Sequence, residues 1–350
     1  MLEYISEETV WLNLQKESGP ILLYGMGNGA DMIIERLNEF GIEYSDVYAS
    51  DEFVRGHYFH GKRVLKYSEA EEKYGDFVSL MTFAVKDDAT INRVWQMSRK
   101  HPFYSLTVPV AGEGLFTREF VEANEEKFDK VYSMLADDKS RETFINLINF
   151  KISGKLDYLL PSFSEKNEVY ENILKLGESE TIVDAGAYNG DTVEEFLSFT
   201  GGTAKKIYAL EPDRKNFAKL VRNTENLPFV EQMNVAAYKE NTSLFFKKSA
   251  GRQSKIADEG EKIEAIAIDS LGDEKISLIK MDIEGSELDA IKGAENTIKT
   301  YKPKLYICAY HRNEDMFSIP LSISEIRSDY KIYFRQHKYI PAWESNFYMV

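Results

Sequence analysis

The chain has 350 residues, which leaves room for two ordinary domains of about 100–200 residues each. Hydrophobic residues make up 43% and charged residues 29%, as in folded globular proteins, and 43 Lys plus Arg against 58 Asp plus Glu leave a net charge of −15. A chain this acidic is badly suited to sequence-independent capture of nucleic acid or of an anionic membrane surface, because both need a basic face. A single cysteine, Cys308, excludes an internal disulfide framework and a thiolate zinc cage within one chain.

The first residues and the hydropathy of the chain favour a cytoplasmic protein. Residues 1–10 carry acidic side chains where a signal peptide needs basic ones. No apolar run approaches the roughly 18 residues that a membrane-spanning helix requires. We therefore expect no membrane partner and a reducing, cytoplasmic environment, which also suits a chain with one cysteine.

Residues 1–112 are predicted to form a small Rossmann-like α/β domain. Ile21–Tyr24 is a short apolar strand, and after a glycine loop apolar side chains recur at helical spacing at Ile33, Ile34, Leu37 and Phe40. Further strands are expected at 47–49, 77–83 and 105–110. Short strands that alternate with helices predict a mostly parallel sheet covered on both faces.

The glycine loop of this first domain is GlyMetGlyAsnGlyAla at 25–30. A strand precedes it and a helix follows it, which is the context in which bare backbone N–H groups bind pyrophosphate. Asp51 follows at about the 20-residue offset of a ribose-binding acid, so Gly25, Gly27, Gly29 and Asp51 are candidate nucleotide-binding residues. The spacing departs from G-x-G-x-x-G, and a tight turn that binds nothing is the alternative.

The middle of the chain and its C-terminal half differ in pattern. Residues 113–165 keep apolar side chains at helical spacing, with no glycine between Gly114 and Gly154, and are predicted to form a helical connector. Residues 166–350 alternate strands and helices again. Strands are expected near 181–183, 207–210, 229–235, 242–247, 263–268, 277–282 and 304–309, helices near 193–197, 214–223 and 288–298, and a closing hairpin from 330–334 and 347–350.

A second glycine loop, AspAlaGlyAlaTyrAsnGly at 184–190, follows the first strand of this half. Its acid would repel phosphate, but it suits a ligand with an ammonium group and a sulfonium centre, such as S-adenosylmethionine. We expect Asp184 to hold the amino-acid end, directly or through water, and Gly186 and Gly190 to let the backbone approach the ligand closely. Glu211 ends the next strand, where an ionised carboxylate can accept hydrogen bonds from both ribose hydroxyls. A structural turn plus a solvated glutamate is the alternative.

Two further groups of polar residues follow later strands. LysMetAspIleGluGlySerGlu at 280–287 carries Asp282 and Glu284, and His311 stands just past the strand at 304–309. Ligands of doubly wound sheets bind beyond the carboxyl ends of the strands. Asp282 is thus a candidate for cofactor contact and catalysis, and His311 is a candidate base, because histidine titrates near neutral pH. Asp282, Glu284 and His311 are also weak candidates for binding Mg²⁺ or Mn²⁺, although we favour a reaction without metal.

Together these segments resemble the FkbM family of S-adenosylmethionine-dependent methyltransferases. The matching segments are ValAspAlaGlyAlaTyrAsnGlyAspThr (183–192), AlaLeuGluProAsp (209–213), AsnValAlaAla (234–237), LysMetAspIleGluGlySerGlu (280–287) and the strand that ends in TyrHis at 310–311. The resemblance covers residues 181–350 and implies a class I, Rossmann-like methyltransferase domain. More loosely, the first domain resembles the small Rossmann-like domain of some sugar-modifying bacterial enzymes, and residues 138–154 resemble the connector of two-domain family members.

The expected architecture is therefore α/β, with a Rossmann-like domain (1–112), a helical connector (113–165) and an FkbM-like methyltransferase domain (166–350). The resemblance implies an S-adenosylmethionine-dependent O-methyltransferase that acts on a hydroxyl of a sugar-like or related small molecule. A nicotinamide-nucleotide-dependent oxidoreductase that uses the first glycine loop is one alternative, and a non-catalytic nucleotide- or sugar-binding protein is another. Neither nucleic acid nor a membrane is expected as a partner.

Overall fold

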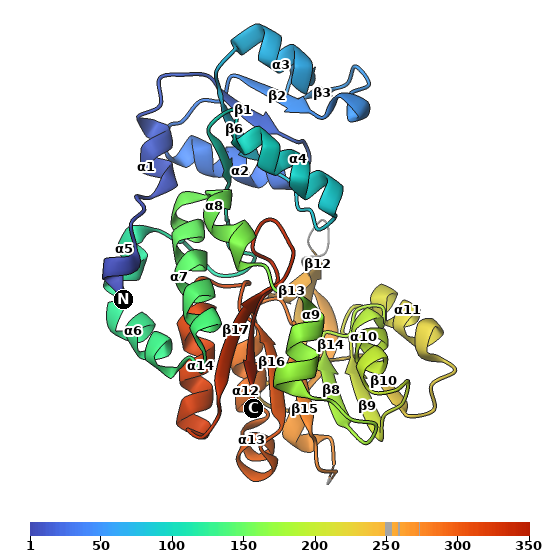
Figure 1. Cartoon of the computed structure of the whole chain (residues 1–350). Helices are drawn as coiled ribbons and strands as arrows, with labels where there is room; N and C mark the ends of the chain where they lie inside the picture. Colours follow the sequence, from blue (N-terminus) through green and yellow to red (C-terminus); the bar gives the residue numbers. More distant parts are fainter. Residues whose placement is uncertain (249–253, 258–259, 273) are drawn as a thin grey trace.

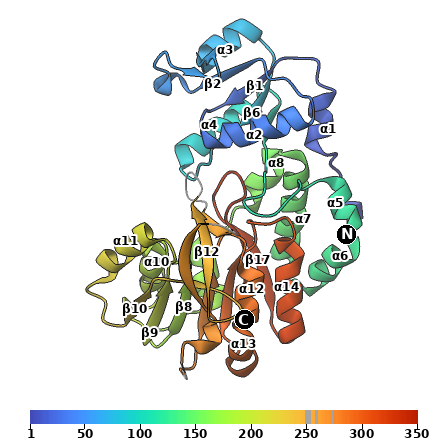
Figure 2. The same cartoon turned by 180° about the vertical axis from the view of Figure 1, so that it is seen from behind.

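The chain is built around two main β-sheets, one in each half (Figure 1). The computed structural model describes residues 1–248, 254–257, 260–272 and 274–350. In Figures 1 and 2 the N-terminal sheet lies at the top and the larger C-terminal sheet at the bottom, with helices from the middle of the chain beside and between them. The fold is α/β, as the sequence predicts.

The N-terminal sheet is entirely parallel, with the strand order β5-β2-β1-β6-β7. Its strands are β1 (Ile21–Tyr24), β2 (Asp46–Ala49), β5 (Leu65–Lys66), β6 (Val78–Met81) and β7 (Phe103–Ser105). The other elements of this half are η1 (Leu2–Tyr4), α1 (Val10–Gln15), α2 (Asn28–Glu39), η2 (Asp51–Phe53), β3 (Tyr58–Phe59), β4 (Lys62–Arg63), α3 (Tyr67–Tyr74) and α4 (Asp88–Ser98). Helices pack on both faces of the sheet, which explains why every residue of β1 is buried and apolar or aromatic.

One predicted strand of this half is wrong over most of its length. The sequence predicts a strand over 105–110, but β7 ends at Ser105. Pro109 lacks the N–H group that would continue the ladder. The chain instead runs to the C-terminal half, where the Ala111 N–H donates to the carbonyl oxygen of His311 at 2.8 Å. This segment therefore joins the two halves of the molecule.

The region between the two sheets is helical, as predicted. It contains α5 (Arg118–Ala123), α6 (Glu125–Met134), α7 (Asp138–Ser153), α8 (Leu156–Leu159), η3 (Leu160–Ser162), α9 (Lys166–Glu168) and the π-helix η4 (Val169–Leu174). The Asp137 carboxylate caps α7 by accepting the Ser140 N–H, and Gly154 ends this helix in the left-handed conformation. α7 packs against strand β17 (Ile332–Gln336) of the C-terminal sheet. The domain boundaries at 112 and 165 stay predictions.

The C-terminal sheet has the strand order β10-β9-β8-β15-β16-β18-β17. Besides β17, its strands are β8 (Thr181–Ala185), β9 (Lys206–Leu210), β10 (Val230–Met233), β15 (Leu278–Met281), β16 (Lys304–Cys308) and β18 (Ser345–Met349). All neighbours are parallel except β18, which runs antiparallel to both β16 and β17, so the predicted closing hairpin is confirmed. The strand order reverses beside β8, and in such sheets ligands bind beyond the carboxyl ends of the strands at that point.

The helices of this half are α10 (Asp191–Phe199), α11 (Arg214–Thr224), η5 (Ile268–Ser270), α12 (Glu287–Lys292), α13 (Glu295–Tyr301) and α14 (Asp315–Ile326). The single helix predicted near 288–298 is in fact two helices, α12 and α13. They separate at Gly293, where a Cβ atom would collide with the carbonyl oxygen of Tyr238. Among the described residues, no helix is long and apolar enough to cross a membrane.

A separate four-stranded sheet flanks the main one, in the order β11-β14-β12-β13. Its strands are β11 (Val235–Ala237), β12 (Thr242–Lys248), β13 (Ser254–Ala257) and β14 (Glu261–Ile266). The strands predicted near 242–247 and 263–268 therefore exist but lie outside the main sheet. β12 pairs antiparallel with β13 and β14, a pattern unlike the parallel core beside it.

A buried charge network ties the connector to the C-terminal sheet. The Arg335 side chain of β17 is almost fully buried, and its guanidinium lies 2.6 Å from Asp137 Oδ2 and 3.2 Å from Glu168 Oε2. It also donates to Ser140 Oγ at 2.7 Å. Burial acts to raise the pKa of Asp137, but hydrogen bonds from Arg335 and Ser140 outweigh it and lower the pKa to about 2.

We expect Arg335→Ala to lower the free energy of unfolding by about 3–5 kcal/mol, because two carboxylates would lose their buried partner. Urea denaturation followed by circular dichroism measures this change. Arg222 is exposed, and Arg222→Ala is the control, with an expected effect within about 0.5 kcal/mol. The stabilisation from ionised Asp137 should be present above about pH 3.9 and should be lost as the pH falls toward 2. Equal stability of Arg335→Ala and wild type at pH 7 would contradict this account.

Candidate active site

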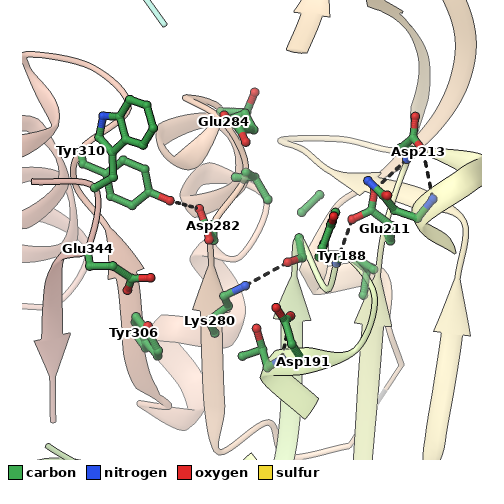
Figure 3. Close-up of a pocket in the computed structure, with 18 of the residues that line it drawn as sticks. Tyr188, Asp191, Glu211, Asp213, Lys280, Asp282, Glu284, Tyr306, Tyr310 and Glu344 are labelled. Atoms are coloured by element: carbon green, nitrogen blue, oxygen red, sulfur yellow. Dashed lines mark hydrogen bonds between the residues drawn. The ribbon is translucent and has the colours of Figure 1, made fainter. Parts of the chain in front are cut away.

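A cavity of about 450 Å³ lies beyond the carboxyl ends of β8, β9, β15 and β16 (Figure 3). The loops after β8, β9 and β15 form one side of it. Residues of β16 and of segment 339–344, which connects β17 to β18, form the other side. Lys86 and Val110 of the N-terminal half also line the cavity, so both halves of the chain build it.

The loop after β8 approaches the loop after β15 very closely. Gly186 has a φ of +82°, and a Cβ atom here would collide with the carbonyl oxygen of Asp282. Glycine is therefore needed at this position for the backbone conformation and for the close approach. Gly190 has a different role, since a Cβ here would lie 3.2 Å from Thr224 Cγ2 and 3.3 Å from Leu220 Cδ1 of α11. Gly190 serves helix packing and does not line the cavity.

Asp184 and Lys280 form an ion pair inside the sheet. The Lys280 Nζ atom lies 3.1 Å from Asp184 Oδ1 and donates to the carbonyl oxygen of Gly186 at 2.9 Å. Asp184 is fully buried, and burial raises its pKa against the pull of the Lys280 charge. Burial acts to lower the pKa of Lys280, but Asp184 and Asp282 outweigh it and raise this pKa. Asp184 lies behind the cavity wall, a position that does not suit direct ligand contact, so contact through water is the part of the sequence-based expectation that stays a prediction.

Glu211 lines the cavity after β9 with its carboxylate held by backbone N–H groups (Figure 3). Oε2 accepts the Tyr188 N–H at 2.9 Å, and Oε1 accepts the Asp213 N–H at 2.8 Å. Burial raises the pKa of Glu211 to about 7, although both hydrogen bonds act to lower it. A carboxylate oxygen has two acceptor sites, so each oxygen can still accept a bond from a ligand hydroxyl.

Asp282 lies where the two sides of the cavity meet. Its Oδ1 atom accepts the Tyr310 hydroxyl at 2.9 Å and lies 3.3 Å from His311 Nε2. Burial acts to raise the pKa of Asp282, but His311 and Lys280 outweigh it and hold this pKa well below its usual range. Asp282 is therefore a permanently ionised acceptor of hydrogen bonds and a weak base.

His311 is fully buried behind Asp282 and does not line the cavity. Its Nδ1 atom lies 2.9 Å from Glu287 Oε1, on the side away from Asp282. Burial acts to lower the pKa of His311, but Glu287 and Asp282 outweigh it and raise this pKa well above its usual value. An imidazolium has no free lone pair to accept a proton, so this geometry does not suit the base role that the sequence suggested.

Glu284 lines the cavity in a strained turn. Its φ of +55° is unusual for a residue with a side chain. A Cβ at the next residue, Gly285, would lie 2.6 Å from the Cβ of Ala111, so the turn packs tightly against the segment from the N-terminal half. Burial raises the pKa of Glu284 to about 7, against the opposing charge of His311. A carboxyl group that titrates near neutral pH and faces a cavity is suited to accept a proton.

The three weak metal candidates meet at the His311 ring. Nε2 of His311 lies 3.3 Å from Asp282 Oδ1 and 3.8 Å from Glu284 Oε2. Within the described chain, the buried residues Glu287, His311 and Asp315 form a tighter group, with potential ligand atoms within 4.8 Å of one another. The ion pair between His311 and Glu287 accounts for their proximity. The sequence analysis did not single out Glu287 as a site residue.

The first glycine loop contributes no residue to this cavity. A Cβ at Gly25 would lie 2.7 Å from Thr82 Oγ1, and one at Gly29 would collide with the carbonyl oxygen of Thr82. Gly27 has a φ of +118° and open space around it. The Asp51 carboxylate accepts the N–H and the hydroxyl of a serine in α3 at 3.1 and 2.6 Å. Contacts within the fold thus account for Gly25, Gly29 and Asp51, and nucleotide binding here stays a prediction.

Aromatic residues line the side of the cavity opposite the glycine loop, which the sequence analysis missed. Tyr306 belongs to β16 and Tyr310 follows it, while Tyr339, Trp343 and Glu344 belong to the segment before β18. The ring centroids of Tyr339 and Trp343 lie 6.0 Å apart. The available signal was the run of aromatic and acidic residues in TyrIleProAlaTrpGlu, after a predicted strand.

Backbone pairing between the two halves fixes the position of this aromatic side. Val85 and Ile340 exchange two backbone hydrogen bonds, both of 2.8 Å. The Lys338 Nζ atom lies 2.9 Å from Asp88 Oδ1 nearby. These contacts hold Lys86 beside segment 339–344, so the N-terminal half helps to shape the cavity.

Comparison with known proteins identifies the C-terminal half. Residues 184–341 match the Methyltransferase FkbM domain. The crystal structure of Methyltransferase FkbM from Methylobacillus flagellatus has a TM-score of 0.74 at 23% identity, covering 99% of this chain and 92% of that chain. An rRNA methylase from Streptococcus thermophilus has a TM-score of 0.36 at 14% identity, covering 53% of this chain and 95% of that chain. Aeropyrum pernix fibrillarin in complex with natively bound S-adenosylmethionine has a TM-score of 0.33 at 9% identity, covering 50% of this chain and 67% of that chain. A search of curated proteins found no match.

The seven-stranded sheet and the domain match define a class I methyltransferase. Within that class, residues 184–341 carry the FkbM domain, which indicates that the protein is an S-adenosylmethionine-dependent methyltransferase. The methyl donor is accordingly S-adenosylmethionine. This assignment overturns the two alternatives, a nicotinamide-dependent oxidoreductase and a non-catalytic binding protein.

The buried Lys280 ion pair should be essential for stability. We expect Lys280→Met to lower the free energy of unfolding by about 3–5 kcal/mol, because the fully buried Asp184 would lose its cation. Adding Asp184→Asn should restore part of the loss, since it removes one uncompensated charge. Urea denaturation measures both, with exposed Lys215→Met as the control. If the single and the double variant were equally stable, Asp184 would not depend on Lys280.

Proposed function

We propose that this methyltransferase transfers the methyl group of S-adenosylmethionine to a hydroxyl of a sugar-like small molecule. The observation that carries the proposal is the division of the cavity into two chemically different sides that meet at Asp282. A glycine turn, Glu211 and small apolar residues line the first side. Aromatic rings and the carboxylate of Glu344 line the second, and such groups suit a hydroxylated ring, because the rings offer apolar contact and the carboxylate accepts hydrogen bonds.

The first side fits a nucleoside with an amino-acid tail. We propose that Glu211 accepts two ribose hydroxyls through the acceptor sites that the backbone N–H groups leave open. Gly186, where a Cβ would fill the turn, leaves room for the amino-acid end. Asp184 acts indirectly by fixing Lys280, and Gly190 by packing α10 on α11. When bound, the cofactor supplies a methyl group on a positively charged sulfur.

Methyl transfer to oxygen needs an aligned hydroxyl and a group that takes its proton. In our proposal ionised Asp282 orients the acceptor hydroxyl by accepting its hydrogen bond, and Glu284 takes the proton, since its pKa of about 7 matches neutral pH. His311 acts through these two carboxylates as a positioning residue, at 3.3 and 3.8 Å from them. This assignment revises the sequence-based choice of His311 as the base.

The role of Glu284 predicts a specific pH dependence. A base must be ionised to act, so kcat of the wild type should rise as the pH increases through about 7. Glu284→Gln should lower kcat by about 10²–10⁴-fold and remove this rise of kcat with pH, the acidic limb of the profile. It should leave cofactor affinity unchanged. Transfer of radiolabelled methyl groups at saturating S-adenosylmethionine measures the profile.

His311→Gln provides the matched test of positioning. Loss of the imidazolium charge should raise the pKa of Glu284 and move the limb of the kcat profile to higher pH, an effect that mere loosening of the fold would not produce. Full kcat and an unchanged pH profile in Glu284→Gln would return the base role to Asp282.

Glu211 should control cofactor affinity. Each hydrogen bond to a charged group contributes about 1.5–3 kcal/mol, so Glu211→Ala should weaken S-adenosylhomocysteine binding by at least about 10-fold. Affinity for the wild type should fall as the pH decreases below about 7, because the protonated carboxyl group loses an acceptor site. Isothermal titration calorimetry measures both effects, with exposed Glu225→Ala as the control. Unchanged affinity in Glu211→Ala would refute this assignment.

The N-terminal half has a proposed role that does not depend on a nucleotide. Lys86 and Val110 line the acceptor side, so we propose that this half helps to select the acceptor. Nucleotide binding at Gly25, Gly27 and Gly29 stays a separate prediction, as does a cytoplasmic location. We propose no nucleic-acid partner, because acids outnumber bases around the cavity.

A further inference from the structure

The cavity lining carries an excess of negative charge. In the part of the chain that the structure describes, three lysines line it, Lys86, Lys166 and Lys280, against more than twice as many aspartates and glutamates. Among the residues that the structure describes, neither arginine nor histidine lines the cavity. Arginine is the side chain that best binds phosphate and carboxylate groups in two-point geometry, so the lining lacks the usual means of holding an anionic acceptor.

Most of these carboxylates already have a function or a partner. Lys280 serves Asp184 and Asp282 within the sheet. Glu211 and Asp213 belong to the cofactor side, where Asp213 also caps α11. The net charge of the second, aromatic side of the cavity, where we place the acceptor, therefore depends on the other lining lysines and acids.

Glu344 is a carboxylate of the cavity lining whose charge is only partly compensated. The nearest lysine, Lys166, lies 2.7 Å from Glu195 Oε2, and its pKa is raised by attraction to Glu344 as well as to Glu195. Among the described residues, no cation lies within the 4.0 Å ion-pair distance of the Glu344 carboxylate. One ammonium group shared by two carboxylates leaves a net negative charge. Burial raises the pKa of Glu344 against the attraction of Lys166, and the negative charge of Asp282 acts in the same direction as burial.

Aromatic side chains surround this charge. Figure 3 shows the Glu344 side chain between Tyr306 and Tyr310, with its carboxylate turned toward the side of Lys280 and Asp282. Burial raises the pKa of both tyrosine hydroxyls, and the nearby charge of Glu344 acts in the same direction. Trp343 lines the same side of the cavity. A carboxylate beside several aromatic rings is the chemical environment that attracts an organic ammonium ion, since the ring faces and the acid both carry negative potential.

We propose that the acceptor carries a protonated amine next to the hydroxyl that is methylated, and that Glu344 binds this ammonium group within the aromatic side of the cavity. The inference rests on the proposed function and narrows its acceptor from a sugar-like molecule to a hydroxylated amine. The ammonium nitrogen has no lone pair, so it receives no methyl group. The hydroxyl oxygen forms the new bond to the methyl carbon, its proton goes to Glu284, and S-adenosylhomocysteine leaves.

The test compares three small rings of nearly equal size that differ in one group. The probes are trans-2-aminocyclohexanol, trans-cyclohexane-1,2-diol and trans-2-hydroxycyclohexanecarboxylate, titrated by calorimetry at pH 7.5 into full-length protein saturated with S-adenosylhomocysteine. We expect the amine to bind at least about 10-fold more tightly than the diol, and the carboxylate to bind most weakly. Glu344→Gln should abolish the preference for the amine while leaving S-adenosylhomocysteine affinity unchanged. Exposed Glu43→Gln is the matched control and should keep the preference.

A second variant tests the aromatic contribution. Trp343→Leu should weaken binding of the amine by about 3- to 30-fold and binding of the diol by less, because only the cation interacts with the ring face as a charge. Equal binding of amine and diol, a preference for the carboxylate, no binding of the amine, or a preference that survives Glu344→Gln would each overturn the proposal.

The experiment separates this inference from the proposed function, because it measures binding without turnover. If the protein methylates neutral sugars and shows no amine preference, the proposed function stands and the amine proposal fails. If the amine preference is found but the methyl group goes to an atom other than oxygen, the ammonium site stands and O-methylation fails.

Discussion

The ammonium group of Lys280, buried between Asp184 and Asp282, is the interaction on which the rest of the active site depends. It neutralises the acid at the end of β8 and donates to the carbonyl oxygen of Gly186, so it fixes the turn after β8 against β15. With His311 it also keeps the half-buried Asp282 ionised. Each buried charge in this group has a partner of opposite sign, so removing one would leave others uncompensated. The charges around Lys280 therefore stabilise the fold as well as the active site.

This arrangement explains how two carboxylates at the same edge of the sheet can have very different pKa values. Asp282 faces two cations, which hold its pKa well below the usual range, whereas Glu284 is governed by burial, which raises its pKa to about 7. The first suits a fixed acceptor of hydrogen bonds and the second suits proton transfer. The N-terminal half contributes to both, because the segment around Ala111 packs against the turn at Gly285 and bonds to the residue behind Asp282.

Local patterns predicted the strands, the glycine turn at 184–190 and the position of Asp282 at a strand end, because apolar periodicity and turn chemistry depend on neighbouring residues. The same reasoning placed His311 at the carboxyl edge of the sheet, where it lies, but did not predict that its side chain is buried away from the cavity. Its burial and its ion pair with Glu287 arise from tertiary packing, which no local pattern reveals. The aromatic segment at 339–344 was missed for a similar reason, since its position depends on the insertion of β18 between β16 and β17.

The most direct test of the central claim, that methyl donor and acceptor share this cavity and meet at Asp282, is a crystal structure with bound S-adenosylhomocysteine. The account predicts ribose hydroxyls within hydrogen-bond distance of Glu211, the amino-acid end beside Gly186, and the sulfur atom facing Asp282 and Tyr310. The ligand bound at the first glycine loop, or with its sulfur turned away from Asp282, would contradict the account.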